Sequence, residues 1–226
     1  MNKIKMLGVI FLTILIVCYL LIPREYAATV TDSIVRRYKS LAIEEVKGTT
    51  KHYLKKKYTS KDFEIQNIYY DTQEQCYHLQ TRETKENIEF NIDVRGKDIK
   101  DFYLEEKLAK EALELILPLV KQVIPEAEVW IRVGAINNKT DKIEFTKDIK
   151  CLLFVFVNWE GQEITSNVFV DKSTEVKNIL VNNGFALTQL QCLYKSGQAG
   201  NLVLTFDKYN FNLDKENLLA KYVSRN

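Results

Sequence analysis

The sequence predicts an α+β protein in which an N-terminal transmembrane helix is followed by helices packed on antiparallel sheet. Three observations predict this class: an uncharged apolar run over residues 6–22, short runs of alternating apolar residues, and two long segments with apolar residues three or four apart. The 226 residues are 46% hydrophobic and 27% charged, with a net charge of +2, as in globular chains. This near-neutral balance argues against nucleic-acid binding, which needs a basic excess.

The first element is expected to be a membrane anchor. A helix from Ile4 to Ile22 would be about 28 Å long, close to the hydrocarbon thickness of about 30 Å, and Pro23 ends it. Cleavage after Ala28 would put bulky Tyr26 where a signal peptidase needs a small residue, so a retained anchor is favoured over a removed signal peptide. The anchor residues are Met6, Leu7, Val9, Ile10, Phe11, Leu12, Ile14, Leu15, Ile16, Val17, Leu20, Leu21 and Ile22.

The flanking charges bear on orientation. Lys3 and Lys5 form a short basic leader typical of a signal-anchor, although basic residues also follow the span. Long domains cross the membrane largely regardless of charge. We therefore expect a single-pass protein of the cell membrane, with a cytoplasmic N-terminus and an extracellular C-terminal domain.

The first half after the anchor is expected to be one helix and a three-stranded meander. Apolar residues at helical spacing predict a helix over residues 30–58. Strands are predicted at 63–70, 76–82 and 87–94, with turn-rich sequence between them.

A second long helix is predicted to begin at Asp98 or Asp101 by capping, to kink at Pro118 and to end at Pro125. Its expected apolar face is Leu104, Leu108, Ala112, Leu115, Leu119 and Val123. The remaining elements are predicted as strands 128–135, 151–159 and 164–171, a short helix 173–181 ended by Gly184, strands 185–194 and 201–209, and a helix 214–222 capped by Asp214.

The order of these elements suggests a duplicated helix-plus-three-strand unit as one alternative, and a single composite domain as another. The expected divisions are residues 1–28 for leader and anchor, 29–100 for the first helix and meander, and 101–226 for the second unit.

A resemblance accompanies this layout. The basic leader, the anchor, the meander and the stretch Asp101, Tyr103, Leu104 and Glu105 resemble small membrane-tethered proteins of unknown function from low-GC Gram-positive bacteria, over residues 1–117. The helix-on-sheet layout is similar to that of cystatin-like and NTF2-like domains. The resemblance implies no catalytic residues.

No local motif predicts a catalytic, metal or cofactor site. His52 and His78 lack a partner at i, i+4 or in a Cys-x-x-Cys pair, so we expect no zinc site. Among the cysteines, Cys151 and Cys192 could pair or remain free. The acidic pair Glu105–Glu106 is interpreted as a solvated helix surface, since sequence neighbours on a helix do not face each other.

Two features indicate binding. Residues 36–61 carry nine basic side chains against two acidic ones, a net charge of +7 that could contact anionic lipid or wall polymer. These basic residues are Arg36, Arg37, Lys39, Lys47, Lys51, Lys55, Lys56, Lys57 and Lys61. Tyr69, Tyr70, Tyr77 and Trp159 lie near strand ends and form a candidate interaction surface.

The sequence leaves three functions open. The favoured hypothesis is a non-enzymatic interaction module, of accessory or immunity type, that binds another envelope protein. The alternatives are an envelope hydrolase with a non-local active site and a binder of anionic lipid or wall polymer.

Overall fold

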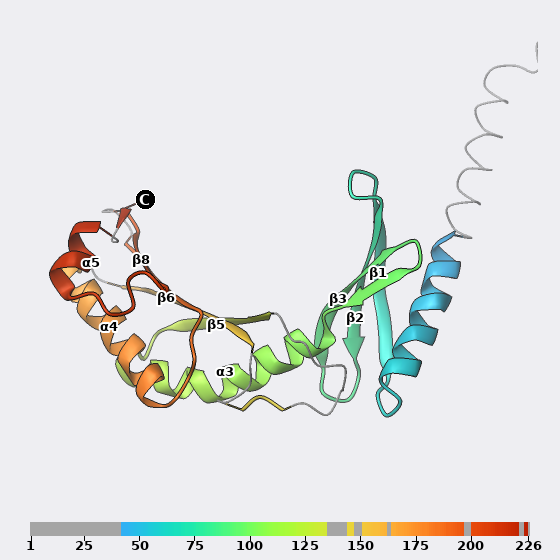
Figure 1. Ribbon diagram of the computed structural model, residues 1–226, viewed down its shortest axis with the longest axis horizontal. Coiled ribbons are helices and arrows are strands. Elements are labelled where there is room, and N and C mark those ends of the chain that lie inside the picture. The colour runs from blue at the N-terminus through green and yellow to red at the C-terminus, as the bar shows by residue number, and fades with distance from the viewer. Residues whose placement is uncertain are drawn as a thin grey trace, which may run out of the picture. The chain divides into compact units, whose positions relative to one another are not determined.

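The computed structural model describes residues 42–134, 144–146, 151–161, 164–196, 200–221 and 224–225 (Figure 1). The chain divides into two compact units, Met1–Tyr53 and Leu54–Asn226. The predicted anchor at 6–22 lies outside the described residues, and no helix within them is both long and apolar enough to cross a membrane. Within the predicted helix 30–58, residues 42–57 are helical and 30–41 are not described.

The first sheet of the described chain is a four-stranded antiparallel meander in chain order. Its strands are β1 (Phe63–Asp71), β2 (Cys76–Glu83), β3 (Ile88–Arg95) and β4 (Asp98–Asp101). The three predicted strands are confirmed to within a residue or two, whereas β4 was not predicted. A left-handed glycine, Gly96 at φ 59°, makes the β3–β4 turn that adds this strand.

The two faces of this sheet differ in chemistry. Alternate residues of β2 and β3, such as Leu79 and Ile92, are fully buried and pair across the strands. An aromatic cluster extends this core, with the rings of Tyr58, Phe63 and Tyr103 within 5.5 Å of one another. The opposite face is polar, because the period of two places the intervening residues there.

Asp98 or Asp101 was predicted to cap the second long helix, and neither does so, because Asp98 begins β4 and Asp101 ends it. The Asp101 carboxylate is buried and accepts hydrogen bonds from the Tyr58 hydroxyl at 2.6 Å and the Lys57 ammonium at 2.7 Å. The N-cap position is Phe102, and no side chain caps the helix there. The acidic residue therefore holds β4 to the end of the first helix instead of starting the next one.

That next helix, α3 (Tyr103–Val123), is confirmed, with Pro118 inside it. Its buried stripe repeats every four residues and comprises Leu104, Leu108, Ala112, Ile116 and Val120. The predicted face is correct at its first three positions and partly so at Leu119 and Val123, which are half-buried against the core, but Leu115 is 47% exposed. The buried face therefore continues from Ala112 to Ile116, four residues on, and not to Leu115, three residues on as predicted. Both steps are close to the 3.6 residues of one helical turn.

The second sheet has the order β5-β6-β7-β8-β9 in the described chain, and β6 and β7 run parallel. Its strands are β5 (Glu128–Gly134), β6 (Leu152–Glu160), β7 (Gln189–Lys195), β8 (Leu202–Phe206) and β9 (Ser224–Arg225). A crossover helix, α4 (Ser166–Asn182), joins the parallel pair, and a short helix, α5 (Lys215–Lys221), follows β8.

The predicted strand 164–171 is wrong, because α4 occupies most of it. The Thr165 hydroxyl accepts a hydrogen bond from the backbone N–H of Val168 at 3.3 Å and caps the helix. The duplicated helix-plus-three-strand unit is also wrong, because this helix interrupts the second set of strands and makes the sheet mixed. The predicted stop at Gly184 is confirmed by its φ of 85° just beyond the helix.

One face of the second sheet is covered by helices. Leu153, Val155 and Val157 of β6 are buried in a core that includes the inner faces of α3 and α4 (Figure 1). The alternate residues of the sheet point to the other face, where Trp130 is 49% exposed and Leu152 is 44% exposed. Among the described residues, helices therefore cover one side of this sheet and leave the other partly exposed.

Candidate functional site

The predicted aromatic surface is only partly exposed. Tyr69 and Tyr70 near the end of β1 are 53% and 47% exposed, and Tyr77 is half-buried beside Tyr70. Trp159 is only 4% exposed and stacks on Phe169 in the second core, so its assignment to an interaction surface is wrong. Its place on the inward-facing alternation of β6 explains this burial.

The basic segment is divided between exposed and paired residues. Arg36, Arg37 and Lys39 lie outside the described residues. Lys51, Lys55 and Lys56 are exposed on the first described helix, as is His52. Lys47 pairs with Glu44, Lys57 with Asp101 and Lys61 with Glu86. Acidic partners therefore neutralise part of the predicted positive charge.

Cys151 and Cys192 are free thiols, as is Cys76. Complete burial raises the pKa of Cys192 to about 12, so this thiol stays protonated at neutral pH. The alternative of a Cys151–Cys192 disulfide is not realised in the structure.

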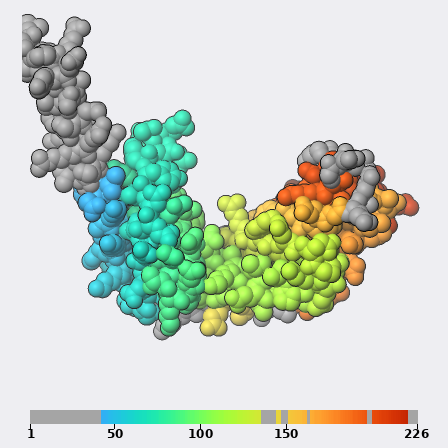
Figure 2. Space-filling model, turned by 180° about the vertical axis from the view of Figure 1, so that it is seen from behind, coloured from blue at the N-terminus to red at the C-terminus, as the bar shows by residue number. Residues whose placement is uncertain are grey.

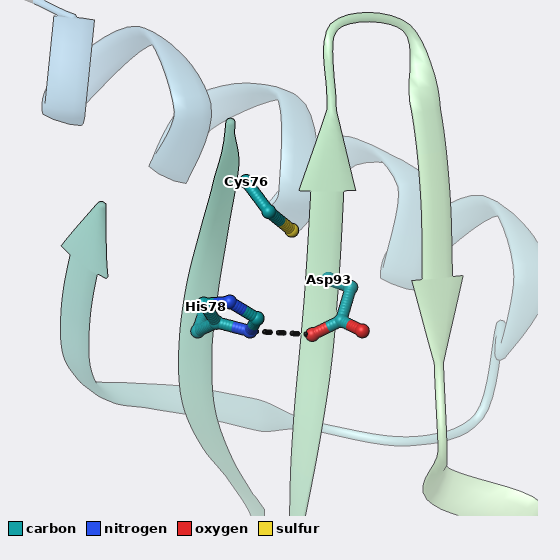
Figure 3. A group of neighbouring side chains, drawn as sticks. All are labelled: Cys76, His78 and Asp93. Carbon is teal, nitrogen blue, oxygen red and sulfur yellow. Dashed lines mark hydrogen bonds and ion pairs between the residues drawn. The ribbon is translucent and has the colours of Figure 1, made fainter. Parts of the chain in front are cut away.

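The polar face of the first sheet carries a cluster that the sequence interpretation missed. Cys76 and His78 lie two residues apart on β2, and Asp93 lies opposite His78 on β3 (Figure 3). His78 Nδ1 is 2.8 Å from Asp93 Oδ1. One ligand-type atom from each of the three residues lies within 4.8 Å of the other two.

Strand geometry explains why this cluster was missed. The prediction considered helical spacing and Cys-x-x-Cys pairs, whereas residues i and i+2 of a strand share a face. The Cys-x-His spacing on a predicted strand was therefore the available signal for Cys76 and His78. Asp93 could be added only from the β2–β3 register, which pairs it with His78.

Neighbouring residues hold this cluster in place. The ring of Tyr69 stacks on the His78 imidazole at 5.0 Å between centroids. Glu74 Oε2 lies 3.9 Å from His78 Nε2 and 2.8 Å from a guanidinium nitrogen of Arg95. A hydrogen bond with the Cys76 sulfur raises the pKa of Arg95, and the nearby Glu74 carboxylate contributes in the same direction.

A second candidate site flanks β5, which is an edge strand of its sheet in the described chain. A cavity of about 320 Å³ is lined by β5 residues 131–134 and by Asn91, Lys100, Phe102, Glu105, Glu106 and Ala109. A neighbouring cavity of about 270 Å³ includes Trp130 and Lys110. The surface is hollowed there in Figure 2, between the green atoms of the first sheet and the yellow-green atoms of β5. We call these two adjoining cavities the β5 groove.

The β5 groove contains perturbed carboxylates. Desolvation, reinforced by the charge of Asp101, raises the pKa of Glu105. Desolvation, reinforced by Glu105, raises the pKa of Glu106, although Arg132 acts in the opposite direction. Glu105 and Glu106 thus border one cavity, which their interpretation as a solvated surface did not anticipate. The basic side chains of Lys100 and Arg132 line the same cavity, so the raised pKa values reflect desolvation of the two carboxyls more than an excess of negative charge.

Comparison of the chain with protein-family models, curated proteins and solved structures finds no match. The sites described above are therefore interpreted from their own chemistry.

Proposed function

We propose that this protein is a membrane-anchored, non-enzymatic interaction module whose folded body lies outside the cell membrane and binds another envelope protein. The apolar run at 6–22 and the basic leader before it support the anchor and its orientation. The β5 groove supports the binding function, because it combines a strand that lies at the edge of the sheet in the described residues with an exposed tryptophan.

The edge of β5 sets the mode of binding. An edge strand leaves one row of backbone N–H and C=O groups available to a further strand. An extended segment of the partner can add to such an edge through main-chain hydrogen bonds, while pockets beside the edge select its side chains. The two cavities of the β5 groove supply those pockets.

Side-chain chemistry narrows the partner segment. Trp130 offers a large, half-exposed apolar surface, and tryptophan is enriched at the energetic centres of interfaces. The desolvated carboxyls of Glu105 and Glu106 would be stabilised in their charged form by a Lys or Arg on the incoming segment, in addition to Lys100 and Arg132 in the same lining. The proposed ligand is therefore an extended segment with an apolar side chain near a basic one.

Site-specific photo-crosslinking tests this proposal. A photoreactive amino acid at Trp130 of the full-length protein, expressed in its native host, should yield a discrete crosslinked product with one envelope protein. The same amino acid at Val181, which is 46% exposed on α4, is the matched control. Absence of a product at Trp130, or the same products from both positions, would contradict the proposal.

The hydrolase alternative has one observation in its favour. Cys76, His78 and Asp93 are residue types found together in nucleophilic catalysis, and His78 contacts Asp93. However, Cys76 is completely buried, and the two cavities of the β5 groove are lined by other residues. A nucleophile must reach its substrate, so we favour the interaction module.

A further inference from the structure

We propose that Cys76, His78 and Asp93 form a binding site for a single Zn²⁺ ion or a similar divalent transition metal. The three side chains lie on the two neighbouring strands β2 and β3 (Figure 3), and none of them lines either cavity of the β5 groove. Thiolate, imidazole and carboxylate together form a mixed soft and hard ligand set that suits zinc better than calcium or magnesium.

The spacing of the ligand atoms is close to that of a zinc site. Zinc–ligand bonds of about 2.0–2.3 Å place tetrahedral ligands about 3.3–3.8 Å apart. The atoms of the three residues lie within 4.8 Å of one another, and the contact between His78 Nδ1 and Asp93 Oδ1 is 2.8 Å. Side-chain rotations that open this contact and bring the Cys76 sulfur closer complete the geometry, without a change in the sheet register.

The backbone of the sheet fixes the relative positions of two pairs of these ligands, Cys76 with His78 and His78 with Asp93. Cys76 and His78 share a strand face, and cross-strand neighbours such as His78 and Asp93 have Cβ atoms about 4.5–5.5 Å apart. Stacking by Tyr69 limits the rotation of the imidazole. A ligand set held on a sheet loses little conformational entropy when it binds an ion.

The surroundings supply an outer shell and a favourable charge. With Nδ1 on the metal, His78 Nε2 is the free ring nitrogen and lies 3.9 Å from the Glu74 carboxylate, and a carboxylate that closes this distance to a hydrogen bond would orient the ring as in other metal-binding histidines. Asp71, Glu74 and Asp93 carry three negative charges near the site, against the positive charge of Arg95. The remaining negative charge attracts a cation.

The site is open on one side. The side chains of His78 and Asp93 are 19% and 26% exposed, so an ion can approach over them toward the buried Cys76 sulfur. Lys100 pairs with Asp93 in the β3–β4 register, but its ammonium lies over the Phe102 ring at 4.7 Å. Three protein ligands leave a fourth position for water, as in zinc sites that are not closed by protein.

Cobalt titration of the full-length protein in detergent, after treatment with a chelator, tests the proposal. We expect one Co²⁺ per chain, a thiolate-to-cobalt charge-transfer absorption, and displacement of Co²⁺ by Zn²⁺. Cys76→Ser should abolish this absorption, and His78→Gln or Asp93→Asn should weaken binding by at least about tenfold. The matched controls, Cys151→Ser and His52→Gln, should bind as the unchanged protein does.

Circular dichroism of each variant separates loss of a ligand from loss of folding, and the half-buried Asp93 offers a variant that leaves the core intact. Persistence of the thiolate absorption in folded Cys76→Ser would overturn the proposal. So would unchanged affinity in folded Asp93→Asn, or a folded, unsubstituted chain that binds neither Co²⁺ nor Zn²⁺ at equimolar concentration.

Discussion

Removal of the Asp101 carboxylate should loosen the first sheet more than any exposed substitution on the same strand. The Asp101 side chain is 1% exposed and accepts hydrogen bonds from the Tyr58 hydroxyl and from Lys57. Asp101→Ala leaves the buried hydroxyl and the half-buried ammonium without this acceptor. Breaking a buried charge pair costs about 3–5 kcal/mol, and a lower value of about 3 kcal/mol applies because Lys57 is 30% exposed.

Hydrogen exchange measured by mass spectrometry is the appropriate assay, because it reports local opening of individual strands. A loss of about 3 kcal/mol corresponds to exchange about a hundredfold faster in peptides from β3 and β4. Tyr58→Phe removes only one donor and should cost about 1 kcal/mol. Asp98→Ala, an exposed position on β4, is the matched control and should change stability by less than about 0.5 kcal/mol. Equal protection in Asp101→Ala and Asp98→Ala would refute the structural role assigned to this carboxylate.

Three further predictions concern charge and thiol chemistry. Hydrogen bonding to Lys61 lowers the pKa of Glu86. The pair therefore stabilises the fold at pH values above the ordinary glutamate pKa, and this stabilisation is lost as the pH falls through the lowered pKa of Glu86. Lys61→Met should lower the free energy of unfolding in urea by about 1 kcal/mol at pH 7, and by progressively less in acid. A maleimide at pH 8 should modify half-buried Cys151 before Cys192, whose thiolate fraction at a pKa of about 12 is about 10⁻⁴; equal labelling of the two in the folded chain would contradict the buried position of Cys192. If the basic segment binds anionic lipid, replacing Lys51, Lys55 and Lys56 by Gln should weaken the binding of anionic vesicles by up to about 3 kcal/mol at low salt. Vesicle binding that changes neither with salt nor with these substitutions would exclude lipid binding by this segment.

The sequence predicted the first sheet well because its strands are defined locally. Clear alternation in residues 87–94 and turn-rich sequence between the runs are enough to place a meander. The same local signals failed at residues 164–171, where β-branched residues suggested a strand but a threonine cap and packing against α3 favour a helix. Tertiary contacts outweigh intrinsic propensity at such positions.

The candidate sites depended on relationships that local patterns do not contain. The cluster on the first sheet requires the register that brings Asp93 opposite His78. The β5 groove requires residues near 90 and 105 to lie beside residues 130–134. Side-chain burial also depends on contacts between distant residues. Trp159 and Trp130 both lie on strands, yet Trp159 is in the core and Trp130 is half-exposed.

We propose that a retained anchor holds the folded body at the outer surface of the membrane, where the β5 groove meets its partner. The most direct measurement adds protease to intact cells that express the full-length protein with a C-terminal epitope tag. We expect the protein to stay in the membrane fraction after salt washing and the protease to remove the tag. A tag protected until the cells are lysed, or a mature protein released into the medium without residues 6–22, would contradict this proposal.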